Sequence, residues 1–478
     1  MIKKLRSRYQ EIPLPAKASL WFVVCSLFQK GITFITTPFF TRMLSTSEYG
    51  ETVLYSSWME IVTIFATFQL SSGVFNKAMI KYEDDRDGYT SSSLFLASSL
   101  TVLLFVIYIC TNSFGDKLFD LSKSMMIMMF IDIFFSTAMS FWSIRNRFEF
   151  KYINVVIFTF LVAIIGPLSS VAFIRISDVA LQAEAKVFGL LLVKIVIYGF
   201  IFAKIFLKGK KFIDLHYWKY SVLYNIPLIP HYLSQQVLTQ SDRIMISFMC
   251  GKGDAAIYGI AYQLSMVAFM FTYAIHNSFT PWSFEKLKKR EYTDIGDKAI
   301  IIEIVIGLMC FFLSLVAPEL IYILGGKRYE TAIWIVPPVA MSVLFQTIYS
   351  LFGNVEFYYE KTWFVMIASI ICAISNLILN YLFIPQYGFV AAGYTTLVCY
   401  VLYAFVHYCF MKRILKAEEI ESIYNGRLMW GIGGGFVSLS IIASVLYNYT
   451  ALRYLLIFLI FAVLVFTIWT KRMDLINR

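Results

Sequence analysis

The stretch from Lys219 to Leu264 reads KYSVLYNIPLIPHYLSQQVLTQSDRIMISFMCGKGDAAIYGIAYQL, and it decides how the rest of the chain is interpreted. It is an apolar run that begins with Pro227 and Pro230 and carries polar groups along its length. Proline removes a backbone donor and bends a helix, while polar groups inside a membrane are costly unless they face water or one another. The stretch therefore predicts a bent helix that lines a solvated path. Its polar members are His231, Gln235, Gln236, Gln240, Asp242 and Arg243.

The composition of the whole chain indicates a membrane protein. Of its 478 residues, 59% are hydrophobic and 15% are charged, whereas a soluble domain carries roughly 25% charged residues. Apolar runs of about 18 residues or more recur, and each is long enough to cross a membrane as a helix. The sequence thus predicts an all-α membrane protein of about fourteen spans. We expect them at about 18–41, 52–74, 91–111, 122–144, 152–174, 186–207, 220–249, 256–280, 299–317, 331–354, 363–384, 389–411, 428–447 and 452–470.

The net charge of +11 follows from this topology and does not indicate nucleic acid as a partner. Most lysines and arginines fall in alternate loops between the spans, and such loops lie on the cytoplasmic side of a membrane. This bias places both termini and the loop 282–298 in the cytoplasm. No small-residue cleavage site follows the first apolar run, so we expect an uncleaved first helix. The seven cysteines form no CxxC pair, and neither disulfides nor a metal site is expected.

A weak internal repeat divides the chain. Tyr49–Gly50 and Tyr258–Gly259 open the second and eighth spans, and a lysine, Lys77 or Lys286, follows each tyrosine after the same interval. Because an even number of spans separates the two units, the halves have the same topology and form parallel repeats about an axis along the membrane normal. We expect six-helix lobes at 1–215 and 216–415 and two further transmembrane helices at 416–478.

Polar residues at helical spacing mark one face of several spans. One such stripe follows the first span and includes Lys30, and another follows the second span and includes Glu60. Serine and threonine also serve close helix packing in membranes, and for the hydroxyls alone we favour that interpretation. A charge at the middle of a membrane costs at least about 2.5–3.5 kcal/mol. We therefore predict that Lys30 and Glu60 pair across adjacent antiparallel helices, with structural and transport roles equally open.

The other charged residues within spans are weaker candidates. Asp242 and Arg243 lie nearer the outer end of the seventh span, where water or a local pair would also satisfy them. Asp132 and Lys194 are central in their spans, but their helix faces are otherwise mostly apolar, so they rank lower. His407 is expected to be satisfied within the fold. The chain has no Gly-rich phosphate loop, HExxH pair or nucleophile elbow, so neither an ATPase motor nor a catalytic centre is indicated.

Short motifs recur along the chain in a definite order. They are Arg42–Met43–Leu44 with Glu48–Tyr49–Gly50, Pro227–Leu228–Ile229–Pro230–His231, Ser241–Asp242–Arg243–Ile244, Ile257–Tyr258–Gly259–Ile260–Ala261–Tyr262, Thr280–Pro281–Trp282, and Pro385–Gln386–Tyr387–Gly388 with Ala391–Ala392–Gly393. In order and spacing they resemble the bacterial polysaccharide flippases, which move O-antigen and capsule repeat units. These flippases belong to the multidrug/oligosaccharidyl-lipid/polysaccharide exporter superfamily. The resemblance covers about the whole chain and implies a multi-pass transporter of the bacterial cytoplasmic membrane.

The resemblance implies that the substrate is an undecaprenyl-diphosphate-linked oligosaccharide, moved by rocking of the two lobes. Its diphosphate and sugars need a wet, partly cationic cavity, whereas the prenyl tail can remain in lipid. Glu60 or Asp242 would carry a coupling H⁺ or Na⁺, and no other cofactor is expected. Expected partners are membrane lipid and the polysaccharide polymerase and glycosyltransferases of the same pathway. The candidate substrate-binding residues are Lys30, Arg42, His231, Gln235 and Arg243.

Two other functions stay open. A cation or drug exporter shares the superfamily fold, but it needs an acid-dominated cavity, and the central Lys30 and Lys194 argue against it. An integral-membrane oligosaccharide polymerase or ligase has a similar hydropathy. Such enzymes present a large loop outside the membrane, whereas the outer loops here are short. We therefore expect a transporter rather than an enzyme.

Overall fold

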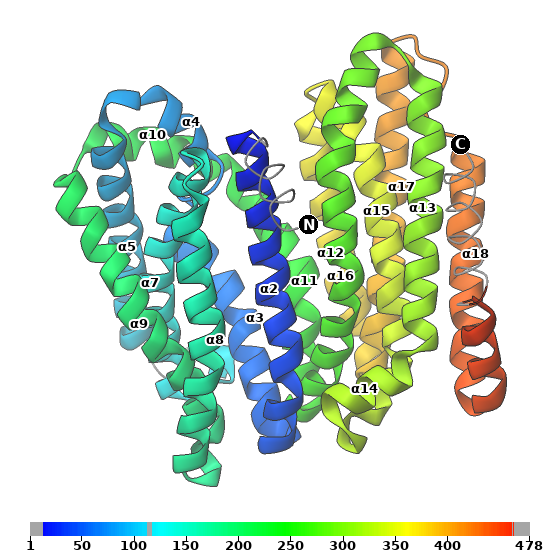
Figure 1. Ribbon diagram of the computed structural model, residues 1–478, viewed down its shortest axis with the longest axis horizontal. Coiled ribbons are helices and arrows are strands. Elements are labelled where there is room, and N and C mark those ends of the chain that lie inside the picture. Colours follow the sequence, from blue (N-terminus) through cyan, green and yellow to red (C-terminus); the bar gives the residue numbers. More distant parts are fainter. Residues whose placement is uncertain (1–12, 112–116, 461, 463–478) are drawn as a thin grey trace, which may run out of the picture. The chain divides into compact units, whose positions relative to one another are not determined.

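The computed structural model describes residues 13–111, 117–460 and 462, which are almost entirely helical (Figure 1). No β-strand occurs in this part of the chain, so the prediction of an all-α protein is confirmed. The α-helices are α2 (Leu14–Met43), α3 (Thr46–Thr67), α4 (Val74–Lys81), α5 (Arg86–Cys110), α7 (Lys123–Phe148), α8 (Tyr152–Ile176), α9 (Gln182–Gly209), α10 (Leu215–Asn225), α11 (Ile229–Cys250), α12 (Lys252–Lys289), α13 (Tyr292–Leu315), α14 (Ala317–Gly325), α15 (Val336–Tyr358), α16 (Thr362–Tyr387), α17 (Val390–Ala417) and α18 (Gly426–Val445).

Within the described residues, eleven helices are long and apolar enough to cross a membrane, so the chain is a multi-pass membrane protein. Helices α3 and α11 are not among the eleven, although each has 22 residues. At 1.5 Å per residue that length reaches about 33 Å, enough to span a bilayer core, but both helices carry many polar residues. The last predicted span, 452–470, begins in the helix Thr450–Ile460 and continues outside the described residues. The number fourteen stays a prediction.

The chain divides into two compact units, Met1–Ala256 and Ile257–Arg478. In the first unit α3 packs along α11, and α8 packs along α9 and α2. In the second unit α15 packs along α17 and α13, and α18 packs on α13 and α15. The division differs from the predicted lobe boundary at 215, because α11 packs on a helix that precedes it. The three predicted segments, 1–215, 216–415 and 416–478, stay a prediction.

Helix α3, which carries the second polar stripe, is fixed at both ends. At its start the Ser45 hydroxyl accepts from the Glu48 N–H at 3.2 Å, and the Glu48 carboxylate accepts from the Ser45 N–H at 2.7 Å, which is a capping box. At its end Phe68 and Gln69 both have positive φ angles. The buried Asn225 of α10 donates to their carbonyls at 3.1 and 2.9 Å. These hydrogen bonds stabilise a turn whose positive φ angles are unfavourable for most residues and least favourable for β-branched ones.

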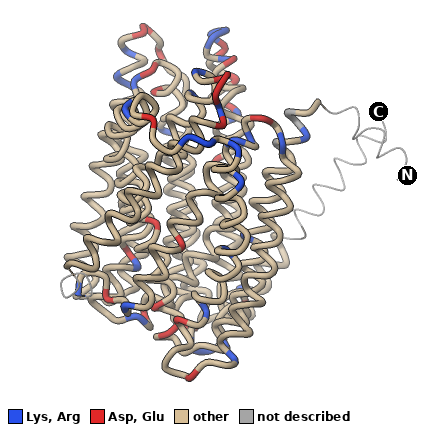
Figure 2. Tube along the Cα trace, turned by 90° about the vertical axis from the view of Figure 1, so that its left-hand side faces the viewer, with Lys and Arg blue, Asp and Glu red and all other residues tan. Residues whose placement is uncertain are grey.

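Charged residues gather at the ends of the helices, and only a few lie midway along them (Figure 2). Between the ends, the first unit is filled by apolar side chains such as Phe75, Tyr89 and Phe141, none of which is exposed. A second apolar core beneath α3 includes Met125 and Met129. Charge placed among such side chains is unfavourable unless it is neutralised. The few mid-helix charges are therefore the places to look for function.

Candidate functional site

The polar stripes on α2 and α3 are satisfied largely by their own helices. The Thr37 hydroxyl donates to the carbonyl of Thr33 at 2.8 Å, and the Thr63 hydroxyl donates to the carbonyl of Met59 at 2.6 Å. Such bonds satisfy a hydroxyl proton without a second helix. The hydroxyl oxygens keep lone pairs that can accept further hydrogen bonds. The stripes are thus polar surfaces able to accept hydrogen bonds, and not only contacts between helices.

The predicted ion pair between Lys30 and Glu60 is not formed. Both side chains are exposed, and α2 packs mainly on α8, with few contacts to α3. The oppositely charged groups that act most strongly on Glu60 are Lys194 and Arg243, and Asp132 acts on it as a like charge. The prediction, which allowed the pair to form only in some states, is not met in this conformation, because α2 packs mainly on α8 and not on the helix that follows it in the chain.

Four charged residues form the mid-span cluster of the first unit: Glu60 on α3, Asp132 on α7, Lys194 on α9 and Arg243 on α11. The Lys194 ammonium lies 2.7 and 2.9 Å from the two oxygens of Asp132, which is 3% exposed. Arg243 donates to the side-chain oxygen of Gln240 at 2.6 Å. Two acids balance two bases, so the cluster carries no net charge into the membrane. Sequence reasoning ranked Asp132 and Lys194 low because it judged each helix face by itself.

Lys186 of α9 is a second cation within a span and is half-buried, and sequence reasoning missed it. Its ammonium donates to the Thr52 hydroxyl at 2.7 Å and lies 4.9 Å from the ring centre of Phe40 and 4.3 Å from that of Tyr49. Aromatic faces attract a cation, but among the described residues no acidic side chain forms an ion pair with Lys186. The only signal in the sequence is a lysine at the start of an apolar run, which also fits an ordinary interfacial residue.

The remaining predicted site residues lie on α2 and α11. Arg42 is exposed near the end of α2, and its guanidinium donates to the carbonyl of Pro38 at 2.9 Å. His231 and Gln235 are one turn apart on α11, and both are partly buried. Asp242 has no exposed surface. The structure thus brings Glu60 and Arg243 into the mid-span cluster, while the functional roles of all seven residues stay predictions.

The second unit contains a buried acid–imidazole pair. Glu356 of α15 and His407 of α17 are 0% and 1% exposed, and the Glu356 carboxyl lies 2.7 Å from Nδ1 of His407. The rings of Tyr349 and Tyr403 lie 5.3 and 4.8 Å from the imidazole. The prediction that His407 is satisfied within the fold holds only for Nδ1, because Nε2 of His407 and the second oxygen of Glu356 are buried without a hydrogen-bond partner among the described residues. Its partner was missed because the two residues are 51 positions apart in the sequence.

Comparisons with known proteins agree with this fold. The model of a family described as polysaccharide biosynthesis protein matches residues 16–287, and the MatE model matches residues 227–382. A Haloferax volcanii protein named "Probable low-salt glycan biosynthesis flippase Agl15" is 22% identical over 455 residues, which cover 91% of this chain and 90% of that protein. The lipid II flippase MurJ in an inward closed conformation has a TM-score of 0.66 at 13% identity, over 93% of this chain and 98% of that chain. An inward-facing MATE family multidrug transporter of the MOP superfamily also has a TM-score of 0.66 at 13% identity, over 85% of this chain and 100% of that chain.

Proposed function

This chain belongs to the polysaccharide biosynthesis protein family, and we propose that it is a flippase for an undecaprenyl-diphosphate-linked oligosaccharide repeat unit. It would move this substrate across the cytoplasmic membrane of a bacterium by alternating access, without covalent change to the substrate. The glycan flippase named among its relatives and the shared fold with MurJ support this class of function. The polymerase and glycosyltransferases of the same pathway are the partners we propose.

The observation that carries the proposal is Lys186, a cation within a span that no acidic side chain of the described residues neutralises. Such a charge is costly unless an anion from outside the chain meets it. The rings of Phe40 and Tyr49 hold the Lys186 ammonium in place through cation–π attraction. A diphosphate supplies negative charge and several hydrogen-bond acceptors, which suit a lysine ammonium.

The other residues take supporting roles in this proposal. Lys30, Arg42 and Arg243 extend the positive charge along the path of the diphosphate, and His231 and Gln235 offer hydrogen bonds to the sugars. Glu60 is a carboxylate within a helix of the first unit, and its side chain is exposed, which makes it the first candidate for the carrier of a coupling H⁺ or Na⁺. The fully buried Asp242 is the second candidate for that ion.

A complementation experiment tests the proposal. Cells that lack their own flippase for a lipid-linked oligosaccharide are given this chain, and surface polysaccharide is measured. We expect the wild type to restore export and Lys186→Gln to lower it about tenfold or more, since a charge-assisted hydrogen bond contributes about 1.5–3 kcal/mol. Lys186→Arg should retain most of the export because it keeps the charge. Lys219→Gln, at an exposed lysine of α10, is the control. Normal export in Lys186→Gln cells would contradict the role of Lys186.

We also propose that both termini are cytoplasmic, from the Lys and Arg bias of the loops. The terminal residues 1–12 and 463–478 lie outside the described residues, so the test uses the loop after α12. An Arg290→Cys variant in which the seven native cysteines are replaced by Ser should react with a membrane-impermeant thiol reagent only after the cells are lysed. Labelling in intact cells would show that this loop lies outside the cell and would contradict the proposed topology.

Export of organic cations is a second candidate function, favoured by the MatE match to residues 227–382. Glu303 and Glu356 in the second unit have no exposed surface, and buried acids suit a cationic cargo. This alternative predicts efflux of a cationic dye that is lost in Glu356→Gln and unchanged in Lys186→Gln. The flippase proposal predicts no dye efflux by the wild type.

A further inference from the structure

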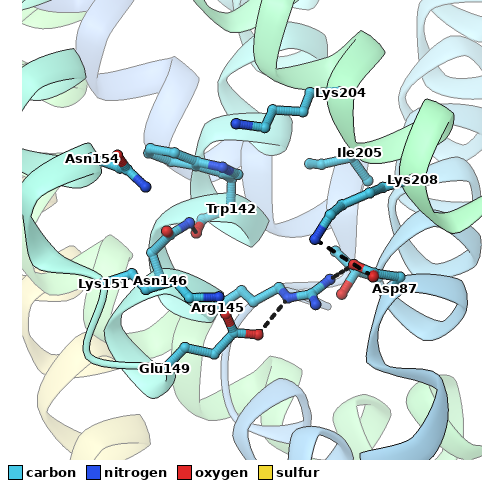
Figure 3. Close-up of a pocket in the computed structure, with 11 residues that line it drawn as sticks. Asp87, Trp142, Arg145, Asn146, Glu149, Lys151, Asn154, Lys204, Ile205 and Lys208 are labelled. Carbon is cyan, nitrogen blue, oxygen red and sulfur yellow. Dashed lines mark hydrogen bonds and ion pairs between the residues drawn. The ribbon is translucent and has the colours of Figure 1, made fainter.

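Four helix ends of the first unit enclose a basic pocket that lies apart from the mid-span cluster. The cavity has a volume of about 120 Å³, several times the space that one water molecule needs. Its walls come from the start of α5, the end of α7, the start of α8 and the end of α9 (Figure 3). The pocket therefore lies at the ends of these four helices, next to the apolar part of the first unit.

The basic pocket has an excess of positive charge. It is lined by four basic and two acidic side chains. Arg145 bonds to both acids, to Asp87 and, at 3.0 Å through Nε, to Glu149. Lys208 lies 3.7 Å from Asp87. Lys204 is exposed and has no acidic partner among the described residues, so a cation remains for an anionic ligand.

A buried tryptophan supplies a second and independent sign of a ligand. Trp142 lines the pocket and is 7% exposed, and its indole N–H, which no group of the described residues accepts, is open to the cavity and is not one of the fully buried unsatisfied atoms. Asn146, also 7% exposed, donates to the Trp142 carbonyl at 2.7 Å and fixes this turn of α7. Figure 3 shows the indole beside the side chains of Lys204 and Asn154. An N–H donor and an ammonium that share one cavity suit the oxygens of a phosphate group.

Apolar side chains around the basic pocket indicate that the phosphate belongs to a lipid. Ile153 and Leu207 are 59% and 75% exposed, and they are the chain neighbours of the pocket residues Asn154 and Lys208. Both lie on membrane-spanning helices, where exposed apolar groups contact acyl chains. Tryptophan favours the membrane interface, and basic pockets between transmembrane helices bind lipid head groups. We propose that the basic pocket binds the phosphate head group of an anionic phospholipid.

Native mass spectrometry of the purified full chain tests this proposal. The protein is given phosphatidylglycerol or phosphatidylcholine with the same acyl chains, and bound lipid is counted. We expect phosphatidylglycerol to be retained and phosphatidylcholine to be lost. Lys204→Gln and Trp142→Phe should each weaken phosphatidylglycerol binding about tenfold, which is the loss of one charge-assisted or buried hydrogen bond. Lys204→Arg should bind as the wild type does, and so should the control Lys219→Gln.

Three outcomes would overturn the proposal. Equal retention of the two lipids would show that charge plays no part, and full binding by both Lys204→Gln and Trp142→Phe would place the lipid elsewhere. Displacement of phosphatidylglycerol by inorganic phosphate at equal concentration would assign the pocket to a soluble anion. Gel filtration of each variant shows whether it is folded, and if Trp142→Phe is misfolded, full binding by Lys204→Gln alone overturns the proposal. Lipid binding is measured without a transport assay, so the result tests this proposal independently of the proposed function.

Discussion

The two units bury charge in different ways. In the first unit Asp132 and Lys194 join α7 to α9 as a pair of opposite charges 2.7 Å apart. In the second unit Glu356 and His407 join α15 to α17 at the same distance, but the base is an imidazole. A lysine pairs with a carboxylate as an ammonium, whereas an imidazole can hydrogen-bond a carboxyl group through a single ring nitrogen. The first pair is therefore a salt bridge between α7 and α9, and the second is a hydrogen-bonded acid–imidazole pair between α15 and α17.

Because the bases of the two pairs differ, breaking each pair should lower the stability of the protein by a different amount. Removing one member of a buried pair of full charges leaves the other charge without compensation. Removing the carboxyl from an acid–imidazole pair leaves a histidine that can stay neutral with one unmet hydrogen bond. The first unit thus depends on its pair for stability more than the second does.

The largest expected effect comes from Asp132→Asn, which leaves the Lys194 ammonium partly buried with only the more distant Glu60 to balance it. We expect a loss of about 3–5 kcal/mol in stability, measured by thermal unfolding of the purified protein. The double variant Asp132→Leu with Lys194→Leu should recover most of that loss, since the buried charge is gone. A single variant as stable as the wild type would show that Glu60 neutralises Lys194 by itself.

A smaller effect is expected from Glu356→Leu. The variant leaves Nδ1 of the His407 imidazole without its hydrogen-bond partner, which costs about 1–3 kcal/mol. Glu356→Gln should lose about 1 kcal/mol or less, because a side-chain amide can either donate to Nδ1 or accept from it. If Glu356→Gln is as unstable as Asp132→Asn, the second pair is a full ion pair and the contrast between the units disappears.

The smallest effect is expected at Glu149, which lies outside the spans. Burial raises the pKa of Glu149, but hydrogen bonds from Lys151 and Arg145 outweigh burial and hold the pKa below its usual value. A lowered pKa stabilises the fold above the usual value near 4.5, and this stabilisation is lost as the pH falls through the lowered pKa. Glu149→Gln should therefore cost about 0.5 kcal/mol at pH 7, and the difference should shrink as the pH is lowered below about 4.5. A constant difference would show that the carboxylate contributes only by packing.

Hydropathy predicted most of the fold, because each apolar run must satisfy its own backbone as a helix in lipid. The prolines Pro227 and Pro230 marked the start of α11. The packing of α11 on α3 could not be predicted, because it depends on tertiary contacts between distant parts of the chain. The site was harder to predict. Glu60 and Arg243 were found because charges within spans are conspicuous, but the partners of Glu60 lie on α7, α9 and α11. Lys186 has no distinguishing pattern in the sequence.

The central claim is that this chain moves a lipid-linked oligosaccharide, and Lys186 is its most specific part. The most direct measurement uses liposomes that contain the purified protein and a polyprenyl-diphosphate-linked oligosaccharide, with a lectin outside that reports the exposed sugar. We expect sugar from the inner leaflet to appear outside with the wild type and with Lys186→Arg. With Lys186→Gln it should appear about tenfold more slowly. Protein-free liposomes set the background rate, and a wild-type rate equal to that background would contradict the account.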